Sequence, residues 1–399
     1  PSAPQCGVVH KRELTINRSH KTTQYKSKLI SALLPCILFT AMAQGAELVF
    51  TYDFESPEII NRDESCRVYV PECDQMSSPG KPILPFLTAR ILLPYGSKLE
   101  SVDAEIQGVG QTFTLSRPVE YGQVPIPIGM NDTTHHLAKS DDTIYNADAP
   151  YPSGHVQFLS IQRLHGRDIA LVRVFPVLYN PAQSRLLFHS QITVVITVRQ
   201  PAQGITTLAT ASVPKERLQR VMDFVDNPEP LPTAQFATMD VTSDSIDYLI
   251  VTAAAMTNSF RPLAEHKTAL GLSVKISAVE DILAAWQGAD SATSLRHYIA
   301  NAYTNWNTSY VLLGGDADVV PYRNAFASVN SITGSIPCDL YFACLDGSWN
   351  SDGDDLWGEP TDGEDGGDVD LLAELYVGRT PVSTPEEADR FVEKSIRYE

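Results

Sequence analysis

Residues 346–370 form the part of the sequence best suited to chemistry, since they hold ten carboxylates and neither lysine nor arginine. Within this stretch Asn350, Asp352 and Asp354 stand at alternate positions, and Glu359 follows. Ca²⁺ takes about six to eight oxygen ligands, and a loop of alternating aspartate and asparagine supplies them around one point. The pattern therefore predicts a calcium site formed by Asn350, Asp352, Asp354 and Glu359.

The acidic stretch differs from the helix–loop–helix calcium loop at two positions. Asp355 stands where that loop has glycine, and Thr361 occupies the twelfth position in place of glutamate. We therefore expect a variant calcium loop. The alternative, a solvated acidic loop that binds no metal, stays open.

Two further carboxylates, Asp316 and Asp318, follow the apolar run 310–313 and a pair of glycines. Open parallel sheets bind ligands outside the carboxyl ends of their strands, so these residues could border a site. Aspartate also ends strands and caps turns for purely structural reasons. No glycine-rich phosphate-binding motif follows a strand, so we expect no nucleotide site.

His266, His297, Cys338 and Cys344 are residue types that form nucleophilic pairs. A catalytic thiolate needs an adjacent base and backbone N–H groups that hold the oxyanion. Nothing in the spacing of these four residues brings them together. We therefore expect solvated or packed side chains here, and a catalytic dyad among them remains the weaker alternative.

The charge balance limits the classes of partner. Among 399 residues, 48 Asp and Glu stand against 30 Lys and Arg, which gives a formal net charge of -18. Such a chain repels nucleic acid and anionic membrane surfaces and attracts divalent cations. The length is sufficient for two or more domains, each with its own core.

Residues 1–43 read as an N-terminal extension and a secretory signal peptide. Six basic residues, with Glu13 as the one acidic residue, precede the apolar run 29–41 and the small-residue motif Ala41-Met42-Ala43. The apolar run is too short for a membrane span, and we expect none after the signal is removed. The sequence thus predicts a secreted, extracellular or cell-surface protein.

Export would permit disulfides. Cys66 and Cys73 are close in sequence, and Cys338 and Cys344 could pair if the chain turns between them. If Cys338 and Cys344 share one extended strand, they lie too far apart to bond.

The elements that must position these residues fall into three further segments. Residues 44–200 show short alternating apolar runs bounded by Pro, Gly and Asn, which predict an all-β, sandwich-like domain. Residues 201–245 read as a linker with one short helix over 213–227. From 246 to 399, strands and helices alternate, which predicts an α/β domain with a mostly parallel sheet.

In this last segment the apolar patterns predict individual elements. Strands are expected at 246–252, 272–277, 310–315, 339–345 and 374–379. Helices are expected at 257–271, 279–286, 291–306 and 384–399, the last with Thr384 as N-cap and Pro385 at its first position.

Eight segments of the α/β region, taken in order, resemble the gingipain-type cysteine peptidases. They are DYLIVT, LAEHKTALGLSV, SLRHYIANAY, YVLLGGDADVVP, CDLYFACLDGSW, DGDDLWGE, ELYVGRTPVST and VEKSIRYE. Residues 80–200 also resemble the β-rich propeptide of that family, in GKPILPFLTARILLPYGSKLESV and VFPVLYNPAQSRLLFHSQITVVITV. The resemblance covers most of the chain after residue 43.

This resemblance implies a caspase-like α/β fold, calcium sites and a secreted cysteine endopeptidase that acts on proteins or peptides. It also implies that the chain's own propeptide inhibits the peptidase until the junction is cleaved, with Lys215, Arg217 and Arg220 as candidate cleavage points. In the family, the catalytic His-Gly and the nucleophilic Cys lie downstream of the helix that ends here at Glu399. We therefore expect a precursor truncated before its catalytic dyad and no catalytic residue in this chain.

Whether the chain itself is an enzyme stays open at this point. The main hypothesis is a gingipain-like endopeptidase precursor. The alternative from another class is a non-catalytic secreted protein that keeps the fold for calcium binding or cell-surface scaffolding. Substrate side-chain specificity and oligomeric state are not indicated by any motif.

Overall fold

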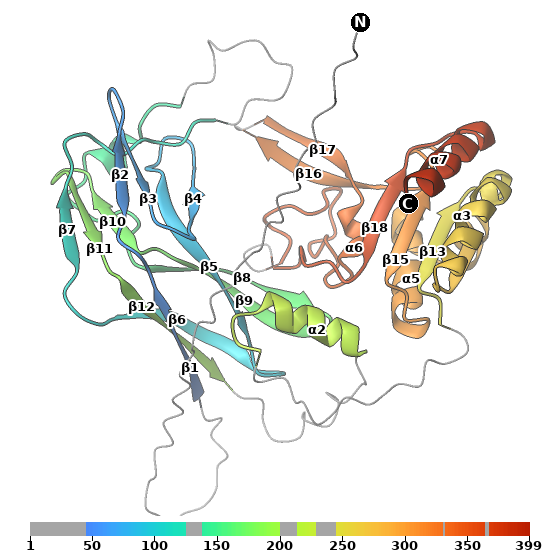
Figure 1. Cartoon of the computed structure of the whole chain (residues 1–399), viewed down its shortest axis with the longest axis horizontal. Helices are drawn as coiled ribbons and strands as arrows, with labels where there is room; N and C mark the ends of the chain where they lie inside the picture. The colour runs from blue at the N-terminus through green and yellow to red at the C-terminus, as the bar shows by residue number, and fades with distance from the viewer. Residues whose placement is uncertain (1–44, 125–137, 200–213, 229–244, 330–331, 364–366) are drawn as a thin grey trace, which may run out of the picture.

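The structure is a computed structural model that describes residues 45–124, 138–199, 214–228, 245–329, 332–363 and 367–399 (Figure 1). The signal peptide predicted at 1–43 and most of the predicted linker lie outside the described residues. Figure 1 shows a β-rich part, coloured blue to green, beside an α/β part, coloured yellow to red.

Twelve strands and a single helical turn make up the described β-rich part. They are β1 Gly45–Asp53, β2 Glu58–Asn61, β3 Cys66–Tyr69, β4 Asp74–Met76, β5 Leu84–Leu92, β6 Lys98–Ile106, β7 Gln111–Thr114, α1 Asp142–Tyr145, β8 Val156–Leu164, β9 Arg167–Val174, β10 Val177–Asn180, β11 Arg185–Phe188 and β12 Gln191–Arg199. Pairing between the named strands of this part is antiparallel. Strands rich in β-branched residues, such as β12, are suited to the pleated, half-buried surface that such sheets present.

Two of these sheets pack face to face. One has the strand order β1-β12-β6 and the other β4-β5-β9-β8. Phe50 and Val194 of the first sheet share one core with Ile91 and Val172 of the second. The predicted sandwich-like arrangement is therefore confirmed.

Helix α2 (Lys215–Phe224) forms where the linker was expected to hold a short helix. Its buried residues Leu218 and Val221 pack on Leu92 and Ile169 of the β-rich part. Just after the helix, Asn227 bonds both the N–H and the carbonyl of Leu92, at 2.7 and 3.0 Å. The helix is thus an integral piece of the β-rich part.

The α/β part contains five described helices, one 3₁₀ turn and six strands. They are β13 Tyr248–Thr252, η3 Ala254–Met256, α3 Thr257–Ala269, β14 Val274–Ala278, α4 Val279–Ala285, α5 Ser291–Asn305, β15 Tyr310–Gly314, β16 Arg323–Val329, β17 Ile332–Cys338, α6 Leu340–Ala343, β18 Tyr376–Thr380 and α7 Pro385–Tyr398. Four of the strands form a sheet in the order β14-β13-β15-β18, with every neighbour parallel.

Helices cover both faces of this sheet because alternate strand residues point to opposite sides. Leu249 and Val311 pack against residues of α4 and α5. Ile250 and Leu312 pack against residues of α3 and α7. This confirms the predicted caspase-like α/β fold with a parallel sheet.

Helix α7 begins as its sequence predicts. The Thr384 side chain accepts from the Glu387 N–H, and Glu387 in turn accepts from the Ser383 N–H at 2.8 Å. These bonds satisfy the N–H of Glu387, which the first helical turn leaves free, and the N–H of Ser383 just before the cap, while Pro385 has no N–H to satisfy.

The strand predicted at 339–345 is wrong, because α6 occupies residues 340–343. Tyr341, Phe342, Ala343 and Cys344 are all buried, so the segment is apolar on every side. A short apolar run of this kind does not distinguish a buried strand from a buried helical turn. The hairpin β16–β17 was not predicted, since its sequence mixes polar and apolar residues without a clear period.

Neither of the two disulfides considered from the sequence forms. Cys66 is a buried free thiol whose Sγ donates to the carbonyl of Arg117. Cys338 and Cys344 are also free. None of the described helices has the length and apolar character that crossing a membrane requires.

Candidate metal centre

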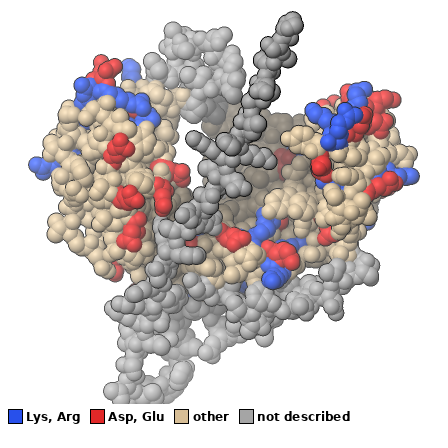
Figure 2. Space-filling view, in the orientation of Figure 1, with Lys and Arg blue, Asp and Glu red and all other residues tan. Residues whose placement is uncertain are grey.

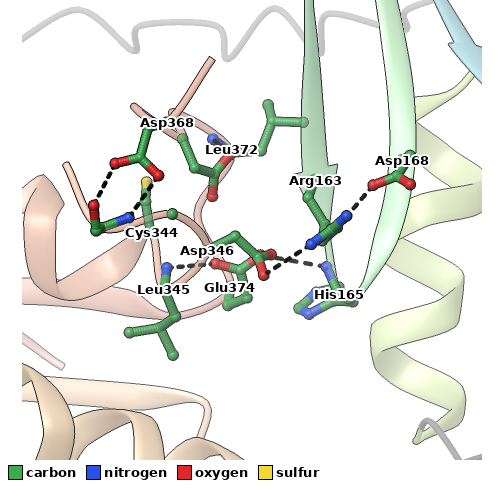
Figure 3. A network of polar contacts seen from close by, with 12 residues as sticks. Arg163, His165, Asp168, Cys344, Leu345, Asp346, Asp368, Leu372 and Glu374 are labelled. Atoms are coloured by element: carbon green, nitrogen blue, oxygen red, sulfur yellow. Dashed lines mark hydrogen bonds and ion pairs between the residues drawn. The ribbon is translucent and has the colours of Figure 1, made fainter. Parts of the chain in front are cut away.

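Three carboxylates meet where the β-rich and α/β parts touch, and Figure 3 shows two of them, Asp346 and Glu374, beside His165 and Arg163 of the β-rich part. One oxygen from each of Asp346, Asp370 and Glu374 lies within 4.8 Å of the other two. All three side chains come from the loop that joins α6 to β18. Asp370 is 4% exposed and Glu374 is 3% exposed, which is unusual for acidic side chains without a partner cation.

Backbone donors hold the carboxylates in place. The N–H of Leu345 donates to Oε2 of Glu374 at 2.8 Å, and the N–H of His165, from the β-rich part, donates to Oε1 at 3.3 Å. Oδ1 of Asp370 accepts from the N–H of Leu372 at 3.1 Å. Oδ2 of Asp370 is buried and makes no hydrogen bond of ordinary geometry among the described residues, although the backbone of Arg163 lies near enough to the carboxyl group to act on its pKa in the lowering direction.

Burial dominates the electrostatics of these groups. Desolvation, with smaller contributions from neighbouring carboxylates, raises the pKa of Asp370 to about 7 and that of Glu374 to about 8. Desolvation also raises the pKa of Asp346. Three ionised carboxylates cannot share a dry site without compensation, so the cluster must retain protons or bind a cation. The unpartnered Asp370 oxygen favours a hard divalent cation such as Ca²⁺.

A cavity of about 500 Å³ leads to the cluster from the junction of the two parts. Ile161 and Arg163 of β8 line one side, and Asp346 and Asp370 line the other. Figure 2 shows acidic and basic side chains lying together where the two parts meet. The cavity gives a small hydrated ion a route to the carboxylates.

The residues predicted as calcium ligands lie in another part of the same loop. The structure brings Asp352, Asp354 and Glu359 to within 4.8 Å of one another, with both aspartates exposed. Asn350 instead bonds within the loop, where Oδ1 accepts from the N–H of Gly353 and Nδ2 donates to the carbonyl of Asp354. A calcium site at these four residues stays a prediction.

Asp362 explains how this acidic loop folds. Its side chain is fully buried, and its carboxylate accepts backbone N–H groups from Ser351, Gly358 and Glu359 at 2.8, 2.9 and 2.9 Å. Three charge-assisted bonds of this kind order the loop from within. The Asp362 carboxylate thus holds residues 351–359 in place without a metal ion. The Asp346–Asp370–Glu374 cluster has no comparable set of hydrogen-bond donors among the described residues.

Sequence reasoning missed the buried cluster. Asp346 and Asp370 bound the acidic stretch, and Glu374 follows it. The available signal was their apolar surroundings, since Leu345, Val369 and Leu371 flank the two aspartates. Carboxylates among Gly and Ser belong to exposed loops, whereas carboxylates beside aliphatic residues enter cores.

The other residues considered for chemistry do not converge. Asp316 and Asp318 are exposed after β15, where the Asp316 side chain accepts from the N–H of Ala317. His266 bonds Glu399 at the end of the chain, and His297 contacts the carbonyl of Gln287. These groups serve turns and helix surfaces.

The thiols of the α/β part lack the setting of a nucleophile. Cys344 is buried beside Asp370 and Glu374, and burial together with their negative charge raises the pKa of its thiol well above the ordinary value. Reactive cysteines require an electropositive and accessible environment. Cys344 is in the opposite environment.

Two arginines of α2 tie the β-rich part to the α/β part. The guanidinium of Arg217 lies 3.7 Å from the ring centre of Tyr303 and donates to the carbonyl of that residue at 2.9 Å. Arg220 donates to the carbonyls of Ala373 and Glu374, at 2.9 Å each. Both arginines are thus engaged in contacts, whereas Lys215 is exposed.

Comparison with solved structures finds several from Porphyromonas gingivalis. A complex of the RgpB pro- and mature domains is 14% identical over 48% of this chain and 94% of that chain, with a TM-score of 0.34. A structure on the zymogenic latency of gingipain K is 15% identical over 41% of this chain and 97% of that chain, with a TM-score of 0.33. Dimeric latent PorU is 14% identical over 89% of this chain and 38% of that chain, with a TM-score of 0.30.

No curated protein matches the chain. Two family models do, and together they span most of the sequence. Propeptide_C25 matches residues 49–224, which contain the β-sandwich and helix α2. Peptidase family C25 matches residues 241–399, which contain the parallel sheet and the carboxylate cluster. The chain therefore belongs to the gingipain-type cysteine peptidases of family C25 and carries the propeptide of that family next to its peptidase region.

Proposed function

We propose that the chain is the propeptide and first part of the catalytic domain of a secreted cysteine endopeptidase, kept latent by the propeptide. The observation that carries the proposal is the interface itself. Arg217 and Arg220 of α2, and the β8–β9 hairpin, bond directly to the α/β part. A propeptide bonded to the peptidase region in this way is suited to keep that region inactive.

The nucleophile and the base would come from sequence that follows Glu399. In support, neither Cys338 nor Cys344 bonds a histidine among the described residues, and the Cys344 thiol is held protonated. In the whole protein, a cysteine thiolate would attack the scissile carbonyl and a histidine would protonate the leaving amine. Backbone N–H groups would stabilise the oxyanion.

We further propose that Asp346, Asp370 and Glu374 hold Ca²⁺. Each supplies a carboxylate oxygen, and Oδ2 of Asp370 has no other partner among the described residues. The cation would balance the buried charge and fix the loop before β18. The exposed set at Asn350, Asp352, Asp354 and Glu359 is proposed as a second, weaker site, because Asp362 already orders that loop.

Export is proposed from the predicted signal peptide at residues 1–43. Amino-terminal sequencing of the latent precursor from culture medium tests it. A start near residue 44 is the expected result, and a cell-retained protein that keeps residues 1–43 would contradict export.

The peptidase hypothesis is tested with the reading frame extended beyond Glu399 and with a site for a specific protease inserted between residues 229 and 244. Cutting at that site and removing the propeptide should release hydrolysis of labelled casein that iodoacetamide blocks. The same protein left uncut is the matched control and should remain inactive. If the separated peptidase region shows no thiol-dependent hydrolysis, the non-catalytic calcium-binding or scaffolding function replaces this proposal.

A further inference from the structure

The tip of the β8–β9 hairpin contacts the carboxylate cluster. Leu164 and Arg167 pair across the hairpin, and the two residues between them, His165 and Gly166, have φ of 50° and 73°. Two successive positive φ values are typical of a type I′ turn, which fits the twist of the strands it joins. The turn directs the N–H of His165 to Oε1 of Glu374 at 3.3 Å (Figure 3).

Residues just before the turn contact the same loop. The Gln162 side chain accepts from the N–H of Leu371 at 2.7 Å. Leu371 lies between Asp370 and Glu374 in the sequence. Nη1 of Arg163 lies 4.0 Å from Oδ1 of Asp346, while its Nε bonds Asp168 at 2.7 Å. The hairpin thus brings a cation and a backbone donor to two of the three carboxylates.

These contacts partly perform the task that a metal ion would perform. The three acids need positive charge or hydrogen-bond donors in a site that excludes most water. With the propeptide docked, Arg163 and the His165 N–H supply some of both. A divalent cation bound to the same oxygens would supply more positive charge. It would, however, repel the nearby Arg163 guanidinium, and it would compete with the His165 N–H for the Glu374 oxygen.

We infer that Ca²⁺ and the β8–β9 hairpin compete for the Asp346–Asp370–Glu374 cluster, so that cation binding loosens the docked propeptide. The inference rests on the metal site proposed above and adds a regulatory role to it. Because linkage is reciprocal, the docked hairpin must weaken Ca²⁺ binding by the same factor by which Ca²⁺ weakens docking. Release of the propeptide would then depend on the calcium concentration outside the cell.

The first test measures Ca²⁺ affinity by calorimetry on the whole chain. Arg163→Gln removes the competing charge and should tighten Ca²⁺ binding about fivefold, within the usual range of such couplings. Arg185→Gln is the matched control, since Arg185 is an exposed arginine on β11 of the same part, and it should leave the affinity unchanged. Unchanged or weaker binding in Arg163→Gln would overturn the competition.

The second test follows the hairpin directly by hydrogen–deuterium exchange. Saturating Ca²⁺ should speed exchange at residues 162–167 and leave the core strand β12 unaffected. Slower or unchanged exchange at the hairpin would refute the inference. If Ca²⁺ binds the wild type but not Asp370→Asn and these two effects are missing, only the competition fails. If the wild type binds no Ca²⁺, the proposed metal site fails and the competition fails with it.

Discussion

Nη1 of Arg220 lies 2.9 Å from the carbonyl oxygen of Glu374, which joins the propeptide helix to the backbone of the buried carboxylate cluster. The same guanidinium bonds Ala373 and lies 4.6 Å from the ring centre of Tyr376 at the start of β18. One propeptide side chain therefore contacts two consecutive elements of structure, which are the end of the acidic loop and the strand that follows it.

Replacing Arg220 should weaken the interface more than any exposed residue of the same helix. We expect Arg220→Gln to cost about 1–3 kcal/mol of docking free energy, because two charged hydrogen bonds and a cation–π contact are lost. The measurement is protease sensitivity of the β8–β9 hairpin in the folded chain. Lys215→Gln, an exposed change on the same helix, is the control, and equal sensitivity of the two variants would contradict the prediction.

Asp370→Asn should abolish stabilisation by Ca²⁺. A ligand at a hundred times its Kd stabilises the folded state by about 2.7 kcal/mol, and this gain should vanish in the variant. Asp352→Asn, in the exposed acidic loop, is the matched control and should retain most of it. Thermal unfolding with and without Ca²⁺ measures the effect. A gain that Asp370→Asn retains and Asp352→Asn loses would move the site to the exposed loop.

Stability without metal should fall as the pH rises. Burial raises the pKa of Glu374 from 4.5 to about 8, so the folded state holds a proton that the unfolded state has lost. The stabilisation is present below pH 4.5 and is lost as the pH rises through about 8. In the presence of a chelator, Tm should therefore fall between pH 6 and pH 9, and it should fall further in the wild type than in the Glu374→Gln variant. Parallel curves for the two proteins would exclude this assignment.

Asp290 should give the opposite pH dependence. It caps α5 through the N–H of Thr293, and buried Arg323 binds both of its oxygens. Burial raises its pKa, but the bonds from Arg323 and Thr293 outweigh burial and lower the pKa from 3.8 to about 2. Its stabilising effect is complete above pH 3.8 and is lost as the pH falls through about 2.

Asp290→Asn should therefore be less stable than the wild type at pH 6, and the difference should shrink as the pH falls from 4 toward 2. Denaturant unfolding at each pH measures it. Asp281→Asn, at an exposed aspartate of the preceding helix, should show no such trend. A pH-independent difference for Asp290→Asn would indicate lost packing instead of a lost charge.

Much of the fold could be predicted because its local signals agree. The strands β13 and β15 are apolar runs of strand length, β14 and β18 alternate apolar with polar or small residues, and α7 carries its own cap and first-turn proline. The segment α6 contradicted the prediction because burial on all sides removes the period that separates helix from strand. The family resemblance was confirmed by the two family models.

The candidate site was harder to predict than the fold. Composition located the acid-rich stretch, but a list of carboxylates does not show which of them the fold will bury. Asp346 and Asp370 come together because the segment before β18 folds back on α6, where the N–H of Glu374 donates to the carbonyl of Ala343 at 3.0 Å. The hairpin around His165 reaches the same cluster from another part of the chain. Burial of this kind depends on tertiary contacts between distant segments, and the spacing of residues along the chain does not predict it.

The pairing of Asn227 with Leu92 determines how the precursor would come apart. A cut anywhere between 229 and 244 severs the chain after this pairing, so α2 departs with the sandwich and keeps Arg217 and Arg220. Scission of the connector thus leaves in place the interface bonds that the described residues make. The two pieces would persist as a nicked complex, and the lag before activity appears would be set by the off-rate of the inhibitor and not by the protease that cuts.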